Sequence, residues 1–453
     1  MITLLRGTRN LAVQKCTISV SAFRAPRTQA ARDGFVKLKL LMNLFSNPIF
    51  NYHDHAFLKL LAFRTQMVFA YQIVAVVVGW HIYELTHDTL ALGLIGLAEV
   101  IPYFSFALFA GHAVDHFYSR RGFGVLAALM LFVNTCILIA ISLGWISAHS
   151  TFWIYASIAI AGVARAFIAP SYSTLFAIIL PRKDFARASG IGTSVFQFGL
   201  VMGPALGGLL VGFTNKTVAY SVASLLFLGA AITLLSLKVK EPPANKDAPP
   251  VLTSIAQGLR FVVNNQILFS AQMLDMFAVL FGGAVAMLPA FIQDVYHLGP
   301  QGLGILRAMP ATGGIMMGLY LTRHPINLHA GRWLLSAVAG FGVCMIVFAL
   351  TTHFWLAAFL LLLSGAFDGV SVVLRNTIMQ LATPNEMRGR VSAINGVFIG
   401  SSNELGAFES GVAAKLLGLV PSVVFGGLMT LSVVGITAKL APKLRTLELQ
   451  QLH

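Results

Sequence analysis

Long apolar segments recur along almost the whole of this chain, and they constrain its fold more than any other feature. A helix that crosses a bilayer core about 30 Å thick needs about 20 apolar residues. Twelve segments meet that requirement, at about 61–84, 91–111, 122–144, 151–173, 189–212, 217–237, 267–290, 302–322, 332–350, 354–376, 391–417 and 421–440. Only 10% of the residues are charged, too few to cover a water-soluble fold. We therefore predict an all-α membrane protein.

A polar stretch at 238–250 divides the twelve segments into two groups of six. It contains two Pro-Pro pairs and five charges, which exclude a spanning helix. Residues 254–265 read as a short amphipathic helix on the membrane surface, or as an extension of the next span. The predicted organisation is a basic, disordered N-terminal tail (1–55), a six-helix bundle (56–237), a linker (238–266), a second six-helix bundle (267–441) and a C-terminal tail (442–453).

The two groups of six also resemble each other in sequence. Gly162 aligns with Gly365, an offset of 203 residues. At that offset identical residues align without gaps across a polar loop: Thr174 with Thr377, Pro181 with Pro384, Arg187 with Arg390, Ser189 with Ser392, Gly203 with Gly406, and Gly208 with Gly411. Chance agreement between two glycine-rich stretches is the alternative. Two pseudo-symmetric six-helix halves are typical of secondary transporters.

The distribution of Lys and Arg predicts the orientation. Placing the N-terminus in the cytoplasm makes every second gap between spans cytoplasmic, and nearly all basic loop residues then fall on that side. The opposite gaps hold one lysine, Lys216. Both termini are therefore predicted to be cytoplasmic. The formal net charge of +15 orients the chain in a lipid bilayer and does not indicate a nucleic-acid partner.

The gap between spans 2 and 3 contains Gly111, Asp115, Arg120 and Arg121. This spacing resembles the signature loop of the major facilitator superfamily, with His116 in place of the usual Arg and Ser119 in place of a Gly. The resemblance implies a conformational latch, in which a carboxylate at a helix end pairs in one state and is released in another. An ordinary cytoplasmic basic loop is the alternative.

Two further segments take part in the resemblance. The equivalent loop of the second half, with Arg388, Gly389 and Arg390, is predicted to be its latch loop. Span 5 resembles the superfamily's antiporter motif, which implies a hinge facing span 8, whereas plain glycine-mediated packing is the alternative. The residues that match the antiporter motif are Gly199, Gly203, Pro204, Gly207 and Gly208.

Segments around Tyr83-Glu84, Arg388 and Glu404-Leu-Gly406 narrow the resemblance to the enterobactin-exporter-like branch, over about residues 48–440. The resemblance implies a major facilitator fold in a bacterial inner membrane, working as a monomer without a cofactor or metal. Substrates in that branch are siderophores and assorted drugs. The three cysteines show no metal-binding spacing.

Ionisable residues inside the spans are the candidates for mechanism, because a charge in hydrocarbon needs a partner or a cavity. Glu99, Asp275 and Asp368 are the candidate proton-coupling carboxylates. Arg165 loosely resembles the span-4 arginine that the superfamily uses near the proton path, and it aligns with Asp368 in the repeat. A structural ion pair is the alternative for each of them, and more so for Glu404 and Glu409.

The sequence thus predicts a secondary transporter that exports a small organic molecule in exchange for protons. An importer or uniporter of the same fold is the alternative. The chain has no P-loop, which disfavours direct ATP drive. An intramembrane enzyme is disfavoured because H-E-x-x-H and G-x-S-x-G are absent, and a scaffold because it would not need buried charges in both halves.

The first 45 residues fall outside the resemblance. They contain eight basic side chains and one acidic side chain, all within residues 1–40. A tail attracted to anionic lipid, an upstream start codon, an interfacial helix and a transit peptide are the open alternatives.

Overall fold

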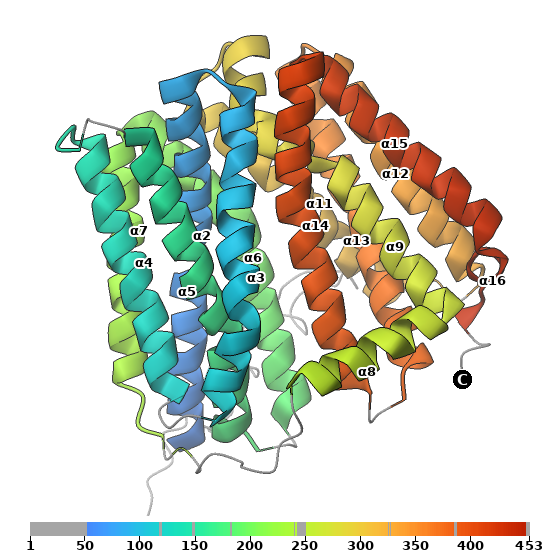
Figure 1. Ribbon diagram of the computed structural model, residues 1–453, viewed down its shortest axis with the longest axis horizontal. Helices are drawn as coiled ribbons and strands as arrows, with labels where there is room; N and C mark the ends of the chain where they lie inside the picture. The colour runs from blue at the N-terminus through green and yellow to red at the C-terminus, as the bar shows by residue number, and fades with distance from the viewer. Residues whose placement is uncertain are drawn as a thin grey trace, which may run out of the picture. The chain divides into compact units, whose positions relative to one another are not determined.

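Twelve long helices pack side by side in the part of the chain that the structure describes (Figure 1). The structure is a computed structural model that describes residues 52–116, 120–146, 150–181, 184–239, 241, 251–324, 326, 328–384 and 387–449. Every regular element in these ranges is a helix. The predictions for the tail before residue 52, for linker residues 242–250 and for residues 450–453 lie outside the described residues.

The first six long helices follow the first six predicted spans closely. They are α2 (Tyr52–Thr86), α3 (Thr89–His116), α4 (Arg120–Ser142), α5 (Ser150–Ile179), α6 (Phe185–Phe213) and α7 (Lys216–Leu235). The first helix begins before the predicted span and takes in the last residues assigned to the N-terminal tail. In this group α2 packs on α6 and α7, α5 on α3 and α4, and α4 on α7.

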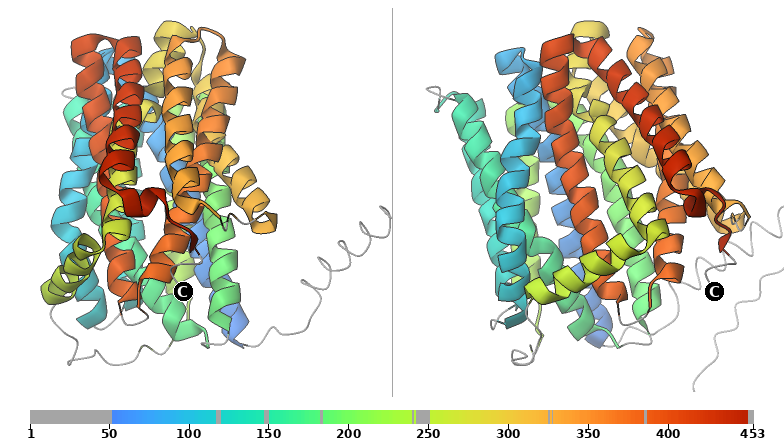
Figure 2. Two further views of the ribbon diagram at one scale, coloured as in Figure 1. Left: turned by 90° about the vertical axis from the view of Figure 1, so that its right-hand side faces the viewer. Right: turned by 45° about the vertical axis from the view of Figure 1, so that its right-hand side comes forward.

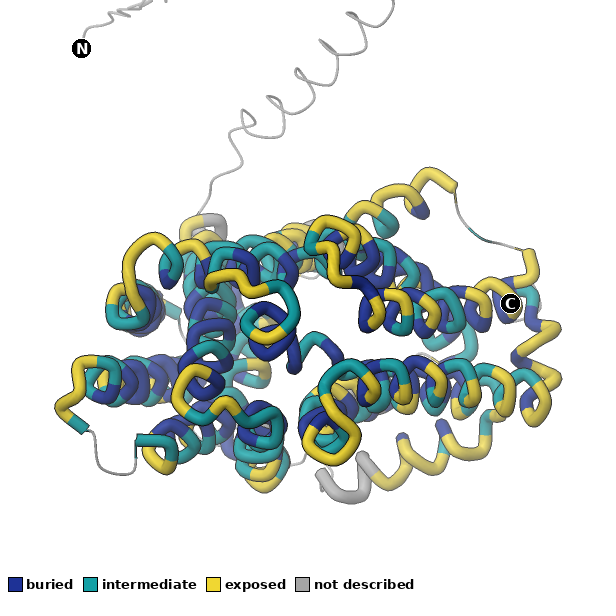
Figure 3. The backbone as a smooth tube through the Cα atoms, turned by 90° about the horizontal axis from the view of Figure 1, so that it is seen from above, coloured by how far each residue is buried: buried dark blue, intermediate teal, exposed yellow. Residues whose placement is uncertain are grey.

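The second group begins with a short helix and ends with another. Its elements are α8 (Val251–Asn264), α9 (Gln266–Phe281), α10 (Leu288–Ala290), α11 (Pro300–Arg323), α12 (Ala330–Leu350), α13 (Phe354–Ala382), α14 (Arg388–Leu417), α15 (Leu419–Leu440) and α16 (Pro442–Arg445). Here α13 packs on α11 and α12, and α12 on α15. In Figure 3 the buried backbone gathers where helices face one another, and exposed residues follow the outer faces.

Ten of the predicted spans lie on helices that are long and apolar enough to cross a membrane. The remaining two, at 302–322 and 391–417, lie on α11 and α14, which are long enough but less apolar. Both helices lie between the two groups, since α11 packs on α6 and α14 on α3. Glycine and polar residues at these contacts explain why the two helices are less apolar than the others.

The seventh span differs from the single helix predicted at 267–290. After α9 the chain passes through a 3-10 turn (Gly283–Met287), the short α10 and a π-helical turn (Phe291–Val295). The break begins at Gly282 and Gly283, where a Cβ atom at Gly283 would lie 2.5 Å from the carbonyl oxygen of Gly406. Pro289 then lacks the N–H group that would continue an α-helix.

The amphipathic segment of the linker is a helix in its own right. At Asn265 the chain leaves the helical conformation, and the side chain of Asn265 accepts hydrogen bonds from the N–H groups of Ile267 and Leu268. This N-cap starts α9 as a new helix, so α8 is not an extension of the next span. Figure 2 shows α8 crossing the ends of the spanning helices. We call this end of the molecule the linker end.

Glycine contacts close the two groups against each other at the end opposite the linker. A Cβ atom at Gly93 of α3 would lie 2.8 Å from the Cα of Gly411 on α14, and one at Gly208 of α6 would overlap Gly304 of α11. Gly208 and Gly411 are equivalent in the 203-residue repeat, so the two contacts are related by the pseudo-symmetry. Only helices without side chains at these points approach so closely.

The same helices separate toward the linker end. A Cβ atom at Gly190 of α6, at Gly318 of α11, or at Gly396 and Gly400 of α14 would meet nothing within 4 Å. In Figure 1, α3 and α14 lie side by side near the top and diverge toward the bottom. The interface between the two groups is therefore closed at one end and open at the linker end.

The closed end gives a direct test of this packing. We expect Gly208→Ala to lower the melting temperature of the purified protein, because the added methyl group overlaps the backbone of Gly304 and overpacking costs about 1–3 kcal/mol. Gly190→Ala is the matched control in the same helix, and it should be neutral or stabilising because its Cβ meets open space. Equal melting temperatures for the two variants would contradict the closed contact.

Candidate functional site

Arg165 of α5 lies at the centre of a charge cluster that joins both groups of helices. Its Nη1 is 2.6 Å from Oε1 of Glu99 on α3 and 3.0 Å from Oε1 of Glu404 on α14. The side chain of Glu99 is 10% exposed and that of Glu404 is 20% exposed. One guanidinium therefore compensates two carboxylates, one from each half of the chain.

Aromatic side chains hold this arginine in place. The Tyr71 hydroxyl of α2 donates a hydrogen bond to Glu99 at 2.5 Å, and Arg165 Nη1 donates to the same hydroxyl at 3.2 Å. The guanidinium also lies over the rings of Tyr71 and Tyr103, at 5.4 and 5.2 Å from their centroids. Such cation–π contacts stabilise a desolvated cation, so Arg165 is fixed from several sides.

Two glycines bring the three helices close enough for these bonds. Gly162 stands one helical turn before Arg165, and a Cβ atom there would overlap the carbonyl group of Glu99. Gly96 stands one turn before Glu99, and its Cβ would lie 2.5 Å from the carbonyl oxygen of Glu404. Arg165 and Glu99 are thus each placed by a glycine three residues earlier, which lets the helix touch the helix of its partner.

Arg307 of α11 adds a second cation near the cluster. Its Nη1 donates to the carbonyl oxygen of Ala75 on α2 at 3.1 Å, a further bond between the two halves. It also interacts electrostatically with Glu99 and Glu404. The cluster therefore contains two arginines and two carboxylates and is close to neutral.

Asp275 and Arg375 form a separate buried ion pair within the second half. Asp275 Oδ2 on α9 is 2.5 Å from Arg375 Nη1 on α13, and both side chains are 6% exposed. Arg375 Nε also donates to Ser371 Oγ at 3.2 Å. Asp275 is thus a fully compensated charge inside the second bundle.

Asp368 lies near this pair but is exposed. No described side chain lies within ion-pair distance of it, although it interacts electrostatically with Asp275 and Arg375. Asp368 lies between two faces of α13. One face contacts α9 through Arg375, and the other contacts α11 through Gly365. Its carboxylate therefore faces the interior space between those helices.

The repeat had placed Arg165 and Asp368 as opposite charges about the axis between the halves. They do occupy equivalent helices, but in the described structure Arg165 pairs with Glu99 and Glu404 instead. The partner of Arg165 in the second half comes from α14, because α14 packs directly on α3 beside it.

Polar contacts accompany the glycine contacts at the closed end. Lys415 Nζ of α14 is 3.1 Å from Asp88 Oδ1, between α2 and α3. The Tyr83 hydroxyl of α2 donates to Asp294 in the broken seventh span. Gln301 Nε2 of α11 donates to the carbonyl oxygen of Gly212 on α6 at 2.8 Å. All three bonds join one half to the other.

The predicted latch loop is described only in part. The backbone N–H groups of Arg120 and Arg121 donate to the Glu241 carboxylate at 2.5 and 3.2 Å, which caps the start of α4. Arg121 Nη1 also donates to the carbonyl oxygen of Leu237 at 2.6 Å. The side chains of Asp115, Arg388 and Arg390 and the surroundings of Gly111 and Gly389 lie outside what the structure describes, so the latch stays a prediction.

The antiporter-like glycines do not all face span 8, and this part of the prediction is wrong. Gly199, Gly203 and Gly207, four residues apart, lie along one face of α6 and pack on Val68, Gln72 and Ile73 of α2. Gly208 lies on the next face and contacts Gly304 of α11, as predicted for the motif as a whole. The carbonyl oxygen of Pro204 lies 3.1 Å from the Cβ position of Gly304. The segment is therefore wedged between α2 and α11.

Sequence reasoning missed several residues of these clusters. Tyr71 and Tyr103 carry no charge and stand among many aromatic residues, so nothing in the sequence marked them. Arg375 is a charge inside a span and could have been found by the rule that selected Asp275. Glu404 was considered mainly structural, yet it is the only carboxylate of the second half within ion-pair distance of Arg165 among the described residues.

Comparison with known proteins decides the family. Residues 62–407 match the family model of the Major Facilitator Superfamily. The chain belongs to this superfamily. It is a multi-pass membrane transporter, and not an enzyme. In the described residues, no group of three or more His, Cys, Asp or Glu is placed to hold a metal ion.

Curated proteins to which the chain is similar include two exporters. The chain is 25% identical over 390 residues to the multidrug efflux pump Tap of Mycolicibacterium fortuitum, covering 83% of this chain and 93% of Tap. It is 24% identical over 261 residues to the enterobactin exporter EntS of Citrobacter koseri, covering 56% of this chain and 62% of EntS. The predicted resemblance to enterobactin-exporter-like proteins is confirmed.

Solved structures confirm the major facilitator fold. A bacterial homologue of the human lysosomal transporter Spinster, in an inward-facing and unoccupied conformation, superposes with a TM-score of 0.66 at 16% identity, covering 87% of this chain and 96% of that one. A D-xylose–proton symporter superposes with a TM-score of 0.64 at 12% identity, covering 86% and 99%.

The buried pair of the second half should be a stability element. We expect Asp275→Asn to destabilise the protein by about 3–5 kcal/mol, because it leaves Arg375 as an uncompensated buried charge. The double variant Asp275→Leu with Arg375→Met should recover most of that loss. Asp368→Asn is the control on the neighbouring carboxylate, and it should melt close to wild type since no described side chain pairs with it. Thermal unfolding in detergent measures all three, and a wild-type melting curve for Asp275→Asn would contradict the assignment.

Proposed function

We propose that this protein exports a small organic molecule across the bacterial inner membrane in exchange for protons, by alternating access. The similarity to a multidrug efflux pump and an enterobactin exporter supports the direction and the class of substrate, a drug or siderophore. The observation that carries the proton coupling is the bridge from Arg165 to carboxylates of both halves, Glu99 and Glu404.

The linker end is the cytoplasmic end in this proposal. The basic loop residues lie on that side when both termini are cytoplasmic, and the lone loop lysine on the other side, Lys216, pairs with Glu84 at 2.7 Å. An interface open at the linker end then corresponds to an inward-facing transporter. A monomer suffices, because both halves of the site come from one chain.

The two bundles, 56–237 and 267–441, are the units that move. Their contacts at the closed end must break for the site to face outward, and new contacts must form at the linker end. Asp115, Arg120 and Arg121, with Arg388 and Arg390 of the second-half loop, lie on the side where those new contacts would form. They are the latch of the outward-facing state in this proposal.

The charge bridge links this movement to protons. In the inward-facing state the two carboxylates are ionised and paired with Arg165. Substrate entering from the cytoplasm displaces Glu404 from Arg165, which removes a bond across the halves and favours outward opening. After substrate leaves, a proton from outside neutralises Glu404. When the halves return and Arg165 approaches again, that proton leaves to the cytoplasm and the ion pair forms once more.

Asp275 and Asp368 hold different positions in this scheme. The buried Asp275–Arg375 pair keeps the second bundle rigid. Asp368 faces the interior from the second half and remains a candidate to take part in proton or substrate binding.

Transport in inside-out vesicles tests the proposal. We expect an imposed pH gradient, acid inside, to drive uptake of enterobactin or of at least one of a panel of fluorescent drugs into vesicles that contain the wild-type protein. Glu404→Gln should lose gradient-driven uptake by about tenfold or more, because a neutral amide cannot exchange a proton. It should retain exchange of labelled for unlabelled substrate without a gradient, since that step needs no proton.

Glu84→Gln is the matched control, because Glu84 pairs within the first half at the closed end. It should transport like wild type. Gradient-driven uptake that is undiminished in Glu404→Gln would contradict the role of the bridge. Substrate that moves from the vesicle lumen to the medium, down its own gradient and without proton movement, would identify an importer or uniporter instead.

A further inference from the structure

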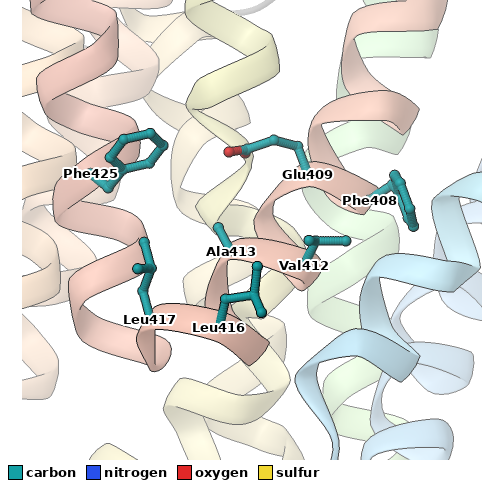
Figure 4. A pocket seen from close by; sticks show the side chains of 7 residues that line it. All are labelled: Phe408, Glu409, Val412, Ala413, Leu416, Leu417 and Phe425. Carbon is teal, nitrogen blue, oxygen red and sulfur yellow. The ribbon is translucent and has the colours of Figure 1, made fainter.

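A groove on the outer surface of the second half contains a carboxylate that the transport mechanism does not use. It lies between α14 and α15 and has a volume of about 400 Å³. Its walls are apolar, and Glu409 is the only charged residue among those that line it. In Figure 4 the Glu409 carboxylate extends from α14 across the groove, in the direction of Phe425 on α15.

The groove faces lipid and not the transport pathway. The other faces of α14 are occupied, by α3 at Ala407 and Gly411 and by the broken seventh span at Gly406 and Ser410. The groove side is exposed instead. Its large apolar side chains are 39–77% exposed, namely Leu416, Leu417 and Phe425.

Helix length places Glu409 about one helical turn inside the boundary between headgroups and hydrocarbon. With 30 residues, α14 is about 45 Å long at about 1.5 Å per residue. Centred on a core about 30 Å thick, it extends about 7 Å beyond the core at each end. Glu409 precedes the last residue, Leu417, by about 12 Å, so it lies about 5 Å inside the core boundary. The amine of a headgroup that dips slightly can reach it.

A carboxylate at this depth requires a cation or strong hydrogen-bond donors. Ser410 gives Glu409 one hydrogen bond, but no described basic side chain forms an ion pair with it. The nearest lysine along the helix, Lys415, is paired with Asp88 on the α3 side. A cation from outside the chain can meet this requirement.

We propose that this groove is a binding site for an amine-bearing membrane lipid, an ethanolamine phospholipid. Its ammonium group pairs with Glu409, and its chains lie along the apolar walls formed by Val412, Leu416 and Phe425. A zwitterionic lipid fits because its ammonium group can pair with the one negative charge of the groove. A lipid with a net anionic headgroup would find no basic residue among those that line the groove. The inference is independent of the transported substrate.

Native mass spectrometry of the full chain tests the site. Delipidated protein is mixed with equal amounts of phosphatidylethanolamine and phosphatidylglycerol of the same acyl chains. We expect wild type to retain the ethanolamine lipid about tenfold more strongly, as one charge-assisted hydrogen bond provides. Glu409→Gln should reduce that preference to near onefold. Glu448→Gln, the same change in the C-terminal tail, should leave it intact.

A second variant separates loss of the site from a folding defect. Ala413→Trp fills the groove without removing Glu409, so it should lower lipid retention while the melting temperature stays within a few degrees of wild type. A photoreactive ethanolamine lipid should label peptides from α14 and α15 in wild type and not in Ala413→Trp. An equal preference in wild type and Glu409→Gln, or labelling confined to other helices, would overturn the proposal. Preferential retention of a soluble amphipathic amine over the lipid would also overturn it.

Discussion

The structure depends on one constraint, that a charge inside a bilayer must be compensated where it lies. An arginine at the centre of a membrane helix costs about 2.5–3.5 kcal/mol even on scales that allow relaxation. Arg165 meets this requirement with two carboxylates and two aromatic rings from three other helices, α2, α3 and α14. The helices must approach closely for that, which is why Gly96 and Gly162 stand one turn before the charges they help to place.

The helix packing around this cluster is pseudo-symmetric, but the charged residues are not. Gly93 contacts Gly411 and Gly208 contacts Gly304. The two helix pairs that join the halves, α3 with α14 and α6 with α11, are therefore closed by the same kind of glycine contact. Arg165 and Asp368 stand at equivalent positions, one after Gly162 and the other after Gly365, and they carry opposite charges. Duplication explains the shared packing, because glycine contacts repeat with the backbone. The charges do not repeat with it: among the described residues, the ion pairs that join the two halves are Arg165–Glu404 and Lys415–Asp88, and both involve α14.

Sequence patterns predicted what is local and missed what depends on distant partners. Apolar length located the long helices, and the repeat located equivalent positions such as Gly208 and Gly411. The break in the seventh span escaped because Gly282, Gly283 and Pro289 are each tolerated in a membrane helix. The contact of Gly283 with α14 is made by residues more than 120 positions later in the chain, so the local sequence does not show it. The partner of Arg165 escaped for the same reason, since Glu404 lies 239 residues away. A row of glycines four residues apart likewise does not reveal which neighbouring helix it contacts. Three of the span-5 glycines contact α2.

Comparison of the two ion pairs indicates why one suits coupling and the other suits a rigid frame. Asp275 and Arg375 belong to the same half, and each side chain is 6% exposed, so neither water nor relative motion of the halves reaches them. Breaking that pair would lower the stability of the second half and would not separate the two halves. Arg165 is 33% exposed and Glu404 is 20% exposed, and the two residues belong to different halves. In the proposed mechanism, a proton or a substrate that reaches Glu404 removes an interaction that joins the two halves. Exposure and position across the moving interface, rather than the mere presence of a buried charge, single out the Arg165–Glu404 pair.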